Sequence, residues 1–387
     1  MDIKELDKEY VAHSYGRFDV ALVKGKGSTL YDENGKEYTD FGSGIGVTAF
    51  GICDEVWADA VKAQLDKLQH VSNLYYTEPC AELAKLLCEK TGMSKVFFAN
   101  SGAEANEGAI KFARKYSFDK YGEGRSTIIT LRDSFHGRTI TTLAATGQDE
   151  FHTHFMPFTE GFKYCTANDI DELNALAGND VCAVMFECIQ GEGGVNDLSL
   201  EFVKAIEKLQ QEKDILIICD EVQTGNGRTG KYFAYENFDI KPDIVTTAKG
   251  LGGGLPIGAV LFSKKTEGSV TYGSHGSTFG GNPICAAGAV SIVKRIDDAF
   301  LLEVKKKSEY IKEFLKGVSG IKSISGMGLM LGIECEKDAG DIAKECLENG
   351  LLVLTAHKNK VRLLPALSIS YGELDKGLNI LKEVIEK

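Results

Sequence analysis

Residues 95–116, KVFFANSGAEANEGAIKFARKY, join a short apolar run to an amphipathic pattern, and this combination decides the class of fold. The run KVFFA has the length and composition of a buried strand. From Glu104 to Tyr116 the apolar residues recur with helical spacing. Ser101 and Gly102 lie between the two patterns, where the helix would begin. The segment therefore predicts a strand followed directly by a helix, the repeating unit of α/β folds.

Strand and helix patterns alternate in the same way along most of the chain. The other clear patterns are helical at 54–70 and 78–90 and strand-like at 126–131, 181–187, 214–222 and 243–249. Residues 27–41 are expected to form two strands joined by a turn at Asn34-Gly35. From about Phe300 onward, helical stretches alternate with short strands. We therefore predict an α/β fold with a mainly parallel sheet, followed by a smaller domain that starts near residue 285.

Composition is that of a large globular protein of the cytoplasm. The 387 residues are 43% hydrophobic and 26% charged, which is typical of a soluble protein with a sizeable core. The net charge of −12 disfavours general binding to nucleic acid or anionic membranes. We expect no signal peptide in MDIKELDKEY and no membrane span. The ten cysteines include no Cys-x-x-Cys pair, which favours buried free thiols in a reducing cytoplasm over disulfides or a metal site.

Polar residues stand where the predicted strands end. They are Asn100-Ser101-Gly102, Glu187, Asp220 and Lys249. Ligands of open α/β sheets bind beyond the carboxyl ends of the strands, so these residues are expected to share one site.

Lys249 and Asp220 have the clearest chemical interpretations of this group. Lys249 follows an apolar strand and precedes glycines, where partial burial would lower its pKa as a Schiff-base lysine requires. A surface lysine at a strand end is the alternative. Asp220 closes the apolar run ILIICD, where its carboxylate could pair with a protonated pyridine nitrogen. A cap for the next helix is an equally good interpretation of Asp220.

The segment around Ser101 and Gly102 has the features of a phosphate site. Free N–H groups and the dipole of the following helix would point at the loop. Ser101 and Glu104 also match a capping box, and both interpretations can hold together. Residues 225–231, GNGRTGK, are similar to nucleotide-binding motifs, but Tyr232 occupies the place of the metal-binding hydroxyl and no clear amphipathic helix follows. We therefore expect a glycine-rich surface loop there.

Ten motifs resemble those of class III (fold type I) pyridoxal-phosphate-dependent aminotransferases, in order and nearly end to end. They are DFGSGIGVTAFG (40–51), SNLYYTEP (72–79), NSGAEANE (100–107), FHGRT (135–139), IQGEGGV (189–195), DEVQTGNGRTG (220–230), AKGLGGGLPIGA (248–259), HGSTFGGNP (275–283), GMGLMLG (326–332) and VRLLPAL (361–367). The resemblance implies a large cofactor-binding domain over 46–284 with a mainly parallel sheet of the seven-stranded type. It also implies a small α+β domain over 285–387, against which the N-terminal segment 1–45 packs.

The chain departs from the family pattern at three places. FGICDE (50–55) replaces a Gly-His-x-His-Pro run, ECIQ (187–190) replaces Glu-Pro-x-Gln, and Leu363-Leu364 replaces an aromatic and small pair. None of the replaced positions has an implied role in cofactor chemistry.

The resemblance implies the cofactor pyridoxal 5'-phosphate and a set of residues that hold it. Lys249 would bond to it covalently, and Asp220 would pair with its ring nitrogen. Phe135 and Val222 would contact the two ring faces, and Gln223 would approach the phenolic oxygen. The other implied cofactor-binding residues are Ser101, Gly102, Ala103, Glu187 and Thr278. No metal is implied.

The resemblance also implies two carboxylate sites and a shared active site. Arg138 would bind the α-carboxylate of N2-acetylornithine, and Arg362 the α-carboxylate of 2-oxoglutarate. Glu192 would act as a gate that pairs with Arg362 while the donor is bound. Ser277, a further implied substrate-binding residue, would reach the phosphate region of the neighbouring subunit together with Thr278. A homodimer would then be the smallest competent unit.

The implied activity is transfer of the δ-amino group of N2-acetylornithine to 2-oxoglutarate, a step of arginine biosynthesis. The products would be N-acetylglutamate 5-semialdehyde and glutamate.

Three alternatives stay open. The donor could be succinylornithine, N-succinyl-diaminopimelate, ornithine or 4-aminobutyrate, although Gly44-Ile45, where ornithine enzymes tend to carry a tyrosine, favours acylated donors. An aminomutase on the same fold would not need the Glu192–Arg362 switch. A non-catalytic binding protein is the third alternative, and the intact Lys249 disfavours it.

Overall fold

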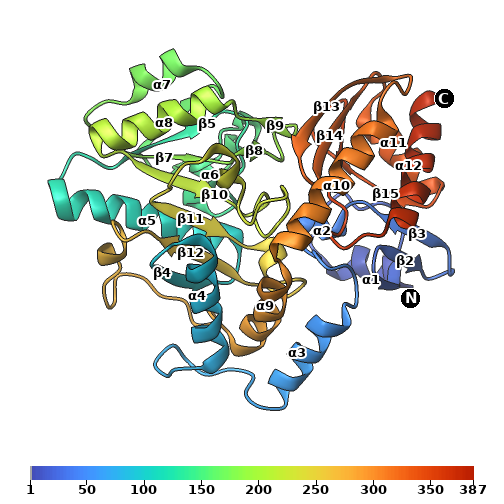
Figure 1. Ribbon diagram of the computed structural model, residues 1–387, viewed down its shortest axis with the longest axis horizontal. Helices are drawn as coiled ribbons and strands as arrows, with labels where there is room; N and C mark the ends of the chain where they lie inside the picture. Colours follow the sequence, from blue (N-terminus) through green and yellow to red (C-terminus); the bar gives the residue numbers. More distant parts are fainter. Residues whose placement is uncertain (1) are drawn as a thin grey trace.

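The computed structural model describes residues 2–387. Figure 1 shows a large sheet with its helices on the left and two smaller sheets on the right, where both termini lie. The predicted α/β class is confirmed. Among residues 2–387, no helix is both long enough and apolar enough to cross a bilayer.

The large sheet has seven strands and is mainly parallel. In spatial order the strands are β4 (Lys95–Ala99), β12 (Gly258–Phe262), β11 (Ile244–Thr247), β10 (Leu216–Asp220), β7 (Val181–Phe186), β5 (Thr127–Leu131) and β6 (Phe162–Cys165). β12 runs antiparallel to both of its neighbours, and the others are parallel. The five strand patterns predicted in this part of the sequence correspond to β4, β5, β7, β10 and β11. Their carboxyl ends therefore meet at one edge of the sheet.

Helices cover both faces of the large sheet (Figure 1). Helix α5 packs on one face, and α4, α8 and α9 pack on the other. The helices of the chain are α1 (Ile3–Tyr10), α2 (Ser43–Gly46), α3 (Glu55–Leu65), α4 (Glu78–Thr91), α5 (Gly102–Tyr121), α6 (Ile140–Ala145), α7 (Ile170–Leu176), α8 (Leu200–Lys213), α9 (Pro283–Arg295), α10 (Asp298–Leu315), α11 (Ala339–Glu348) and α12 (Tyr371–Glu386). The strand–helix unit predicted for residues 95–116 is thus β4 followed by α5.

Two four-stranded sheets and α10 to α12 form the other side of the molecule (Figure 1). One sheet contains β13 (Ile321–Met327), β14 (Met330–Cys335), β17 (Lys360–Leu363) and β16 (Leu354–Thr355). The other contains β1 (Leu22–Lys26), β2 (Thr29–Asp32), β3 (Glu37–Asp40) and β15 (Leu351–Leu352). Because β15 pairs with β3, the beginning of the chain is joined to its C-terminal part. The division into 1–45, 46–284 and 285–387 stays a prediction.

The glycine-rich segment 225–231 was expected at the surface, and this expectation is wrong. Residues 225–230 are buried. A second backbone covers them: a Cβ on Gly328, which has φ +56°, would lie 2.4 Å from the carbonyl oxygen of Arg228. Because glycine has no side chain, these glycines allow the two main chains to approach closely, and they do not form a loop in solvent.

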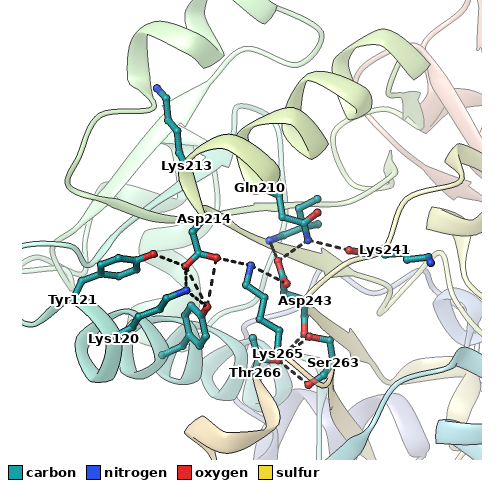
Figure 2. A network of polar contacts seen from close by, with 12 residues as sticks. Lys120, Tyr121, Gln210, Lys213, Asp214, Lys241, Asp243, Ser263, Lys265 and Thr266 are labelled. Carbon is teal, nitrogen blue, oxygen red and sulfur yellow. Dashed lines mark hydrogen bonds and ion pairs between the residues drawn. The ribbon is translucent and has the colours of Figure 1, made fainter.

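A polar network at the C-terminal end of α8 joins the end of α5 to the segments next to β10, β11 and β12 (Figure 2). The Asp214 carboxylate accepts hydrogen bonds from Lys120 Nζ at 2.8 Å and Tyr121 Oη at 2.6 Å, and it pairs with Lys265 Nζ at 2.7 Å. Lys265 also lies 3.3 Å from Asp243. Partial burial acts to raise the pKa of Asp214, but the hydrogen bonds from its donors outweigh it, and the net pKa is lowered.

We expect Asp214→Asn to lower the free energy of unfolding by about 1–3 kcal/mol at neutral pH, because charge-assisted hydrogen bonds are lost. The folded-state pKa of Asp214 is below its unfolded value of about 3.9, so the stabilisation is complete above that value and decreases as the pH falls below it. Urea unfolding should therefore show a constant gap between wild type and variant down to about pH 5 and a smaller gap below about pH 4.

Asp180→Asn is the matched control, since Asp180 pairs with Lys163 at 3.0 Å while its side chain is 44% exposed. Exposed pairs contribute little. Equal losses of unfolding free energy in the two variants would show that the Asp214 network stabilises the fold no more than an exposed ion pair does.

Candidate active site

A cavity of about 480 Å³ lies at the carboxyl ends of β7, β10 and β11. Most of the predicted site residues line it. They are Ser101, Gly102, Ala103, Phe135, Arg138, Glu187, Asp220, Val222, Gln223 and Lys249. The expectation that strand ends would gather polar residues in one place is met, because the strands before Glu187, Asp220 and Lys249 are parallel neighbours.

Lys249 is the first residue of a short 3-10 turn that follows β11. Its φ of +44° is in the left-handed region, a conformation that costs a lysine of order 1–3 kcal/mol and is found most often at functional sites. Burial lowers the pKa of Lys249, although the carboxylates of Glu192 and Asp220 act to raise it. A lowered pKa increases the fraction of neutral amine, the form that can act as a nucleophile or base.

Asp220 is buried and held by three donors. Its Oδ2 accepts from Asn106 Nδ2 at 2.7 Å and lies 2.8 Å from His136 Nδ1, and its Oδ1 accepts from the Val222 N–H at 3.0 Å. Asn106 is fixed in turn, since Thr246 Oγ1 donates to its Oδ1 at 2.7 Å. The carboxylate is therefore rigid and strongly hydrogen-bonded within the cavity wall.

Two ionisable side chains close to Asp220 have perturbed pKa values. Burial acts to lower the pKa of His136, but the hydrogen bond to Asp220 outweighs it, and the net pKa is raised. Burial raises the pKa of Glu187 to about 7, although its Oε2 accepts from the Phe135 N–H at 3.0 Å. Perturbed groups in a cavity are typical of catalytic sites.

The first turn of α5 forms one end of the cavity. The Ser101 hydroxyl accepts from the Glu104 N–H at 3.2 Å, which confirms the predicted N-cap. The Glu104 carboxylate accepts from the N–H of Asn100, one residue before the cap. A Cβ on Gly102 would lie 2.7 Å from Val222, so only glycine fits there. Because the first N–H groups of a helix have no partner within it, this end of the cavity suits an anion.

Phe135 and Arg138 also line the cavity. The guanidinium of Arg138 stands 3.9 Å from the centre of the Phe151 ring and 5.5 Å from that of Phe135. Arg138 is exposed and has no carboxylate partner within residues 2–387. Stacking on aromatic rings orients a guanidinium and leaves its N–H groups free for a bound carboxylate.

Glu192 and Arg362 form an ion pair next to the cavity. Arg362 Nη1 donates to Glu192 Oε1 at 2.9 Å and to Gln223 Oε1 at 3.1 Å. Burial acts to raise the pKa of Glu192, but Arg362 outweighs it, and the net pKa is lowered. The Nε of Arg362 is buried and has no hydrogen-bond partner in the described chain, so this buried cation keeps an unused donor.

Ser277 and Thr278 do not line this cavity. Ser277 Oγ accepts from Nδ2 of Asn100, a lining residue, at 3.0 Å, but Ser277 is not itself part of the lining. Thr278 lines a separate hollow together with Tyr75 and Tyr76. Within one chain, the fold does not bring Thr278 to Lys249.

Asn106 and His136 belong to the site, and the sequence analysis assigned them no role. A feature of the sequence could have pointed to each of them. His136 stands between Phe135 and Arg138 in FHGRT. Asn106 lies one helical turn after Gly102, on the side of α5 that faces the sheet.

Comparison with known proteins gives consistent matches over the whole chain. The family model described as aminotransferase class-III matches residues 10–385. Acetylornithine aminotransferase of Haemophilus ducreyi is 52% identical over 388 residues, which cover 100% of this chain and 98% of the relative.

Solved structures agree with these matches. N-acetylornithine aminotransferase from Stenotrophomonas maltophilia K279a is 36% identical, with a TM-score of 0.85 over 98% of each chain. A structure of ornithine aminotransferase from Toxoplasma gondii with partial occupancy of pyridoxal phosphate at its active site is 31% identical. Its TM-score is 0.93, over 99% of this chain and 93% of that one.

Proposed function

Because the chain belongs to the class III aminotransferase family, we propose that it is an acetylornithine aminotransferase. It transfers the δ-amino group of N2-acetylornithine to 2-oxoglutarate and produces N-acetylglutamate 5-semialdehyde and glutamate, as a step of arginine biosynthesis. The name of the 52% identical relative from Haemophilus ducreyi supports this choice of donor.

One observation carries the proposal: Lys249 shares its cavity with an arginine that has no carboxylate partner, and it lies close to a second arginine that is masked by a carboxylate. Arg138 has free N–H groups in the cavity, whereas Arg362 is paired with Glu192. A donor that has one carboxylate then binds at Arg138 with its far amine at Lys249. A keto acid that has two carboxylates needs Arg362 as well. An aminomutase has no use for this second, switchable site.

The residues in the cavity fit pyridoxal phosphate, on which the family depends. The first turn of α5 suits the phosphate, the buried Asp220 carboxylate suits a protonated ring nitrogen, and Phe135 and Val222 suit the ring faces. Lys249 supplies an amine of lowered pKa for the covalent bond. When bound, the group supplies an electron sink that makes the C–H bond beside the transferred nitrogen acidic.

The side chains of this chain then have distinct tasks. Arg138 holds the carboxylate of the donor, and the Glu192–Arg362 pair keeps that carboxylate from binding in the reverse direction. Lys249, as a neutral amine, would take the proton from the substrate carbon beside the transferred nitrogen and return it to the cofactor carbon bonded to that nitrogen. After the first product leaves, Glu192 releases Arg362, which binds the keto acid.

A single-turnover experiment with the holoenzyme tests the proposal. The visible absorbance of the bound cofactor is followed after mixing with N2-acetylornithine, succinylornithine, N-succinyl-diaminopimelate, ornithine or 4-aminobutyrate. We expect the fastest loss of the band with N2-acetylornithine. A faster loss with another donor would identify that donor, and not N2-acetylornithine, as the substrate. A band that no donor removes would refute the proposed reaction.

Glu192→Ala is expected to weaken selection of the distal amine by about ten-fold, because an unmasked Arg362 can hold the α-carboxylate of a free amino acid. The measurement is the ratio of kcat/KM for N2-acetylornithine to that for L-glutamate in the first half-reaction.

Glu150→Ala is the matched control. Glu150 and Glu192 line the same polar hollow next to the site, and in the described structure Glu150 makes no hydrogen bond or ion pair with Arg362. An unchanged ratio in Glu192→Ala would remove the gate from the mechanism.

We also propose a cytoplasmic homodimer in which Ser277 and Thr278 contribute to the neighbouring active site. Thr278 is exposed beside Tyr76, and large apolar side chains such as Leu74, Tyr272 and Phe279 are exposed in the same segments. Exposed apolar clusters of this kind favour an interface between subunits.

The proposed location in the cytoplasm is supported by the cysteines. All ten are free and seven of them are buried, which is compatible with a reducing compartment.

A further inference from the structure

Arg228 is a buried cation at the junction between the large sheet and the β13–β14–β17–β16 sheet. Its side chain is 2% exposed, and it pairs with no carboxylate in the described chain. We infer that Arg228 is a positioning residue that fixes Arg362 relative to Lys249, so that it controls the half-reaction of the keto acid. This inference rests on the proposed role of Arg362 in binding 2-oxoglutarate.

The guanidinium of Arg228 joins the ends of two paired strands. Its Nη1 donates to the carbonyl oxygen of Leu329 at 3.0 Å and to that of Pro365 at 2.5 Å. Leu329 immediately precedes β14, and Pro365 follows β17 by two residues. The main chain adds a third contact, because the Leu329 N–H donates to the Arg228 carbonyl at 2.9 Å. Arg228 thus holds both strands at the same end.

That end of the strand pair carries Arg362. In the β14–β17 register, Arg362 is opposite Gly332 and Leu363 is opposite Leu331. A shift of the Leu329 and Pro365 carbonyls would move both strands together and would carry Arg362 with them. Such a shift changes the distance from Arg362 to the reacting centre, and a displacement of about 1 Å can reduce rates by about two orders of magnitude.

The loop that carries Arg228 is fastened to the cofactor side of the site as well. Asn226 Nδ2 donates to Thr247 Oγ1 at 2.8 Å and to the carbonyl of Ala248 at 3.3 Å, and Ala248 precedes Lys249. Earlier in the same segment, Gln223 accepts from Arg362. Residues 223–228 therefore connect the lysine and the keto-acid arginine through hydrogen bonds on both sides.

Burial of an unpaired guanidinium is expensive, and this cost argues that Arg228 has a specific task. Burial lowers the pKa of Arg228 to about 9. Two carbonyl groups are its polar compensation, and a planar guanidinium bridges two acceptors more rigidly than an ammonium does. An apolar replacement would leave both carbonyls buried without a donor.

The test compares Arg228→Met and Arg228→Lys in the holoenzyme. For Arg228→Met we expect KM for 2-oxoglutarate to rise by about ten-fold or more, with less than about a two-fold change in KM for N2-acetylornithine. Calorimetric titration with glutarate, a dicarboxylate that cannot react, should show weaker binding by a similar factor. In Arg228→Lys we expect KM for 2-oxoglutarate and the affinity for glutarate to lie between those of wild type and Arg228→Met. If Arg228→Met does not fold, the comparison of Arg228→Lys with wild type is the test.

Lys307→Met is the matched control. Lys307 is also a buried cation, 6% exposed, and it donates to the carbonyl of Leu367 at 3.0 Å, two residues beyond Pro365. In the described structure it makes no hydrogen bond to the loop at 223–228. We expect this variant to lose thermal stability without a change in the ratio of the two KM values. If the Arg228 variants behave in the same way, their role is only structural and the inference is overturned.

Arg362→Met separates the inference from the function on which it rests. If Arg362→Met raises KM for 2-oxoglutarate and the Arg228 variants do not, the inference alone fails. If Arg362→Met leaves that KM unchanged, the proposed keto-acid site fails, and the inference fails with it.

Discussion

Lys249→Ala is expected to lose transaminase activity by more than about four orders of magnitude, with its fold intact. The amine of Lys249 has two tasks in the proposed mechanism: it bonds to the cofactor and it moves the proton. Among residues 2–387, no other amine lines the cavity to replace it. Both half-reactions should therefore be slowed together, which distinguishes this variant from the Arg228 and Glu192 variants. Single-turnover absorbance with each substrate is the measurement.

Lys249→Arg keeps the positive charge and serves as the control for electrostatics. Arginine cannot be neutral at ordinary pH, so we expect it to be as inactive as alanine. Borohydride reduction of the wild type, followed by peptide mass spectrometry, should place the mass of the cofactor on the peptide that contains Lys249. A labelled peptide from elsewhere, or appreciable turnover in Lys249→Ala, would show that a different residue carries the chemistry.

The sequence predicted the fold where local pattern and burial agree. The strands before Glu187 and Asp220 are apolar up to the polar residue that ends the run, and β4, before Asn100, is apolar after its first residue, Lys95. The short strand β12 was not predicted. Its five residues follow a glycine-rich loop, and its antiparallel place between β4 and β11 depends on pairing with segments far away in sequence.

The site was predictable to the extent that its residues lie at strand ends or within motifs. Lys249 and Asp220 could be identified in this way. The support behind Asp220 could not, because Asn106, His136 and Thr246 come from three separate elements that meet only in the fold.

The glycine-rich segment 225–231 shows a second limit. Glycine and polar residues predict an exposed loop, but they also permit the close approach of another main chain. The sequence around Arg228 does not indicate that Gly328, about a hundred residues later, will cover it.

Asp220→Asn is expected to lower kcat by about two to three orders of magnitude while the protein stays folded, because the amide cannot stabilise a positive charge on the cofactor ring. The local geometry adds a second cost. Asp220 Oδ2 faces the donors of Asn106 and His136, and Oδ1 faces the N–H of Val222. Whichever way the asparagine amide is turned, its NH2 group meets at least one donor. The side chain must therefore rotate or lose hydrogen bonds.

Glu221→Gln is the matched control for this prediction, since Glu221 is the next residue and is also a fully buried carboxylate. It accepts from Thr224 Oγ1 at 2.6 Å and from the Tyr235 N–H at 2.9 Å, and it does not line the cavity. Burial raises the pKa of Glu221 to about 7, so a neutral amide is a close substitute, and kcat should change little.

A second readout for Asp220→Asn is the pKa of His136, which the hydrogen bond to Asp220 raises. In Asp220→Asn this pKa should fall, as followed by NMR titration of the histidine. An unchanged kcat, or equal losses in the two variants, would mean that the charge of Asp220 has no part in the reaction.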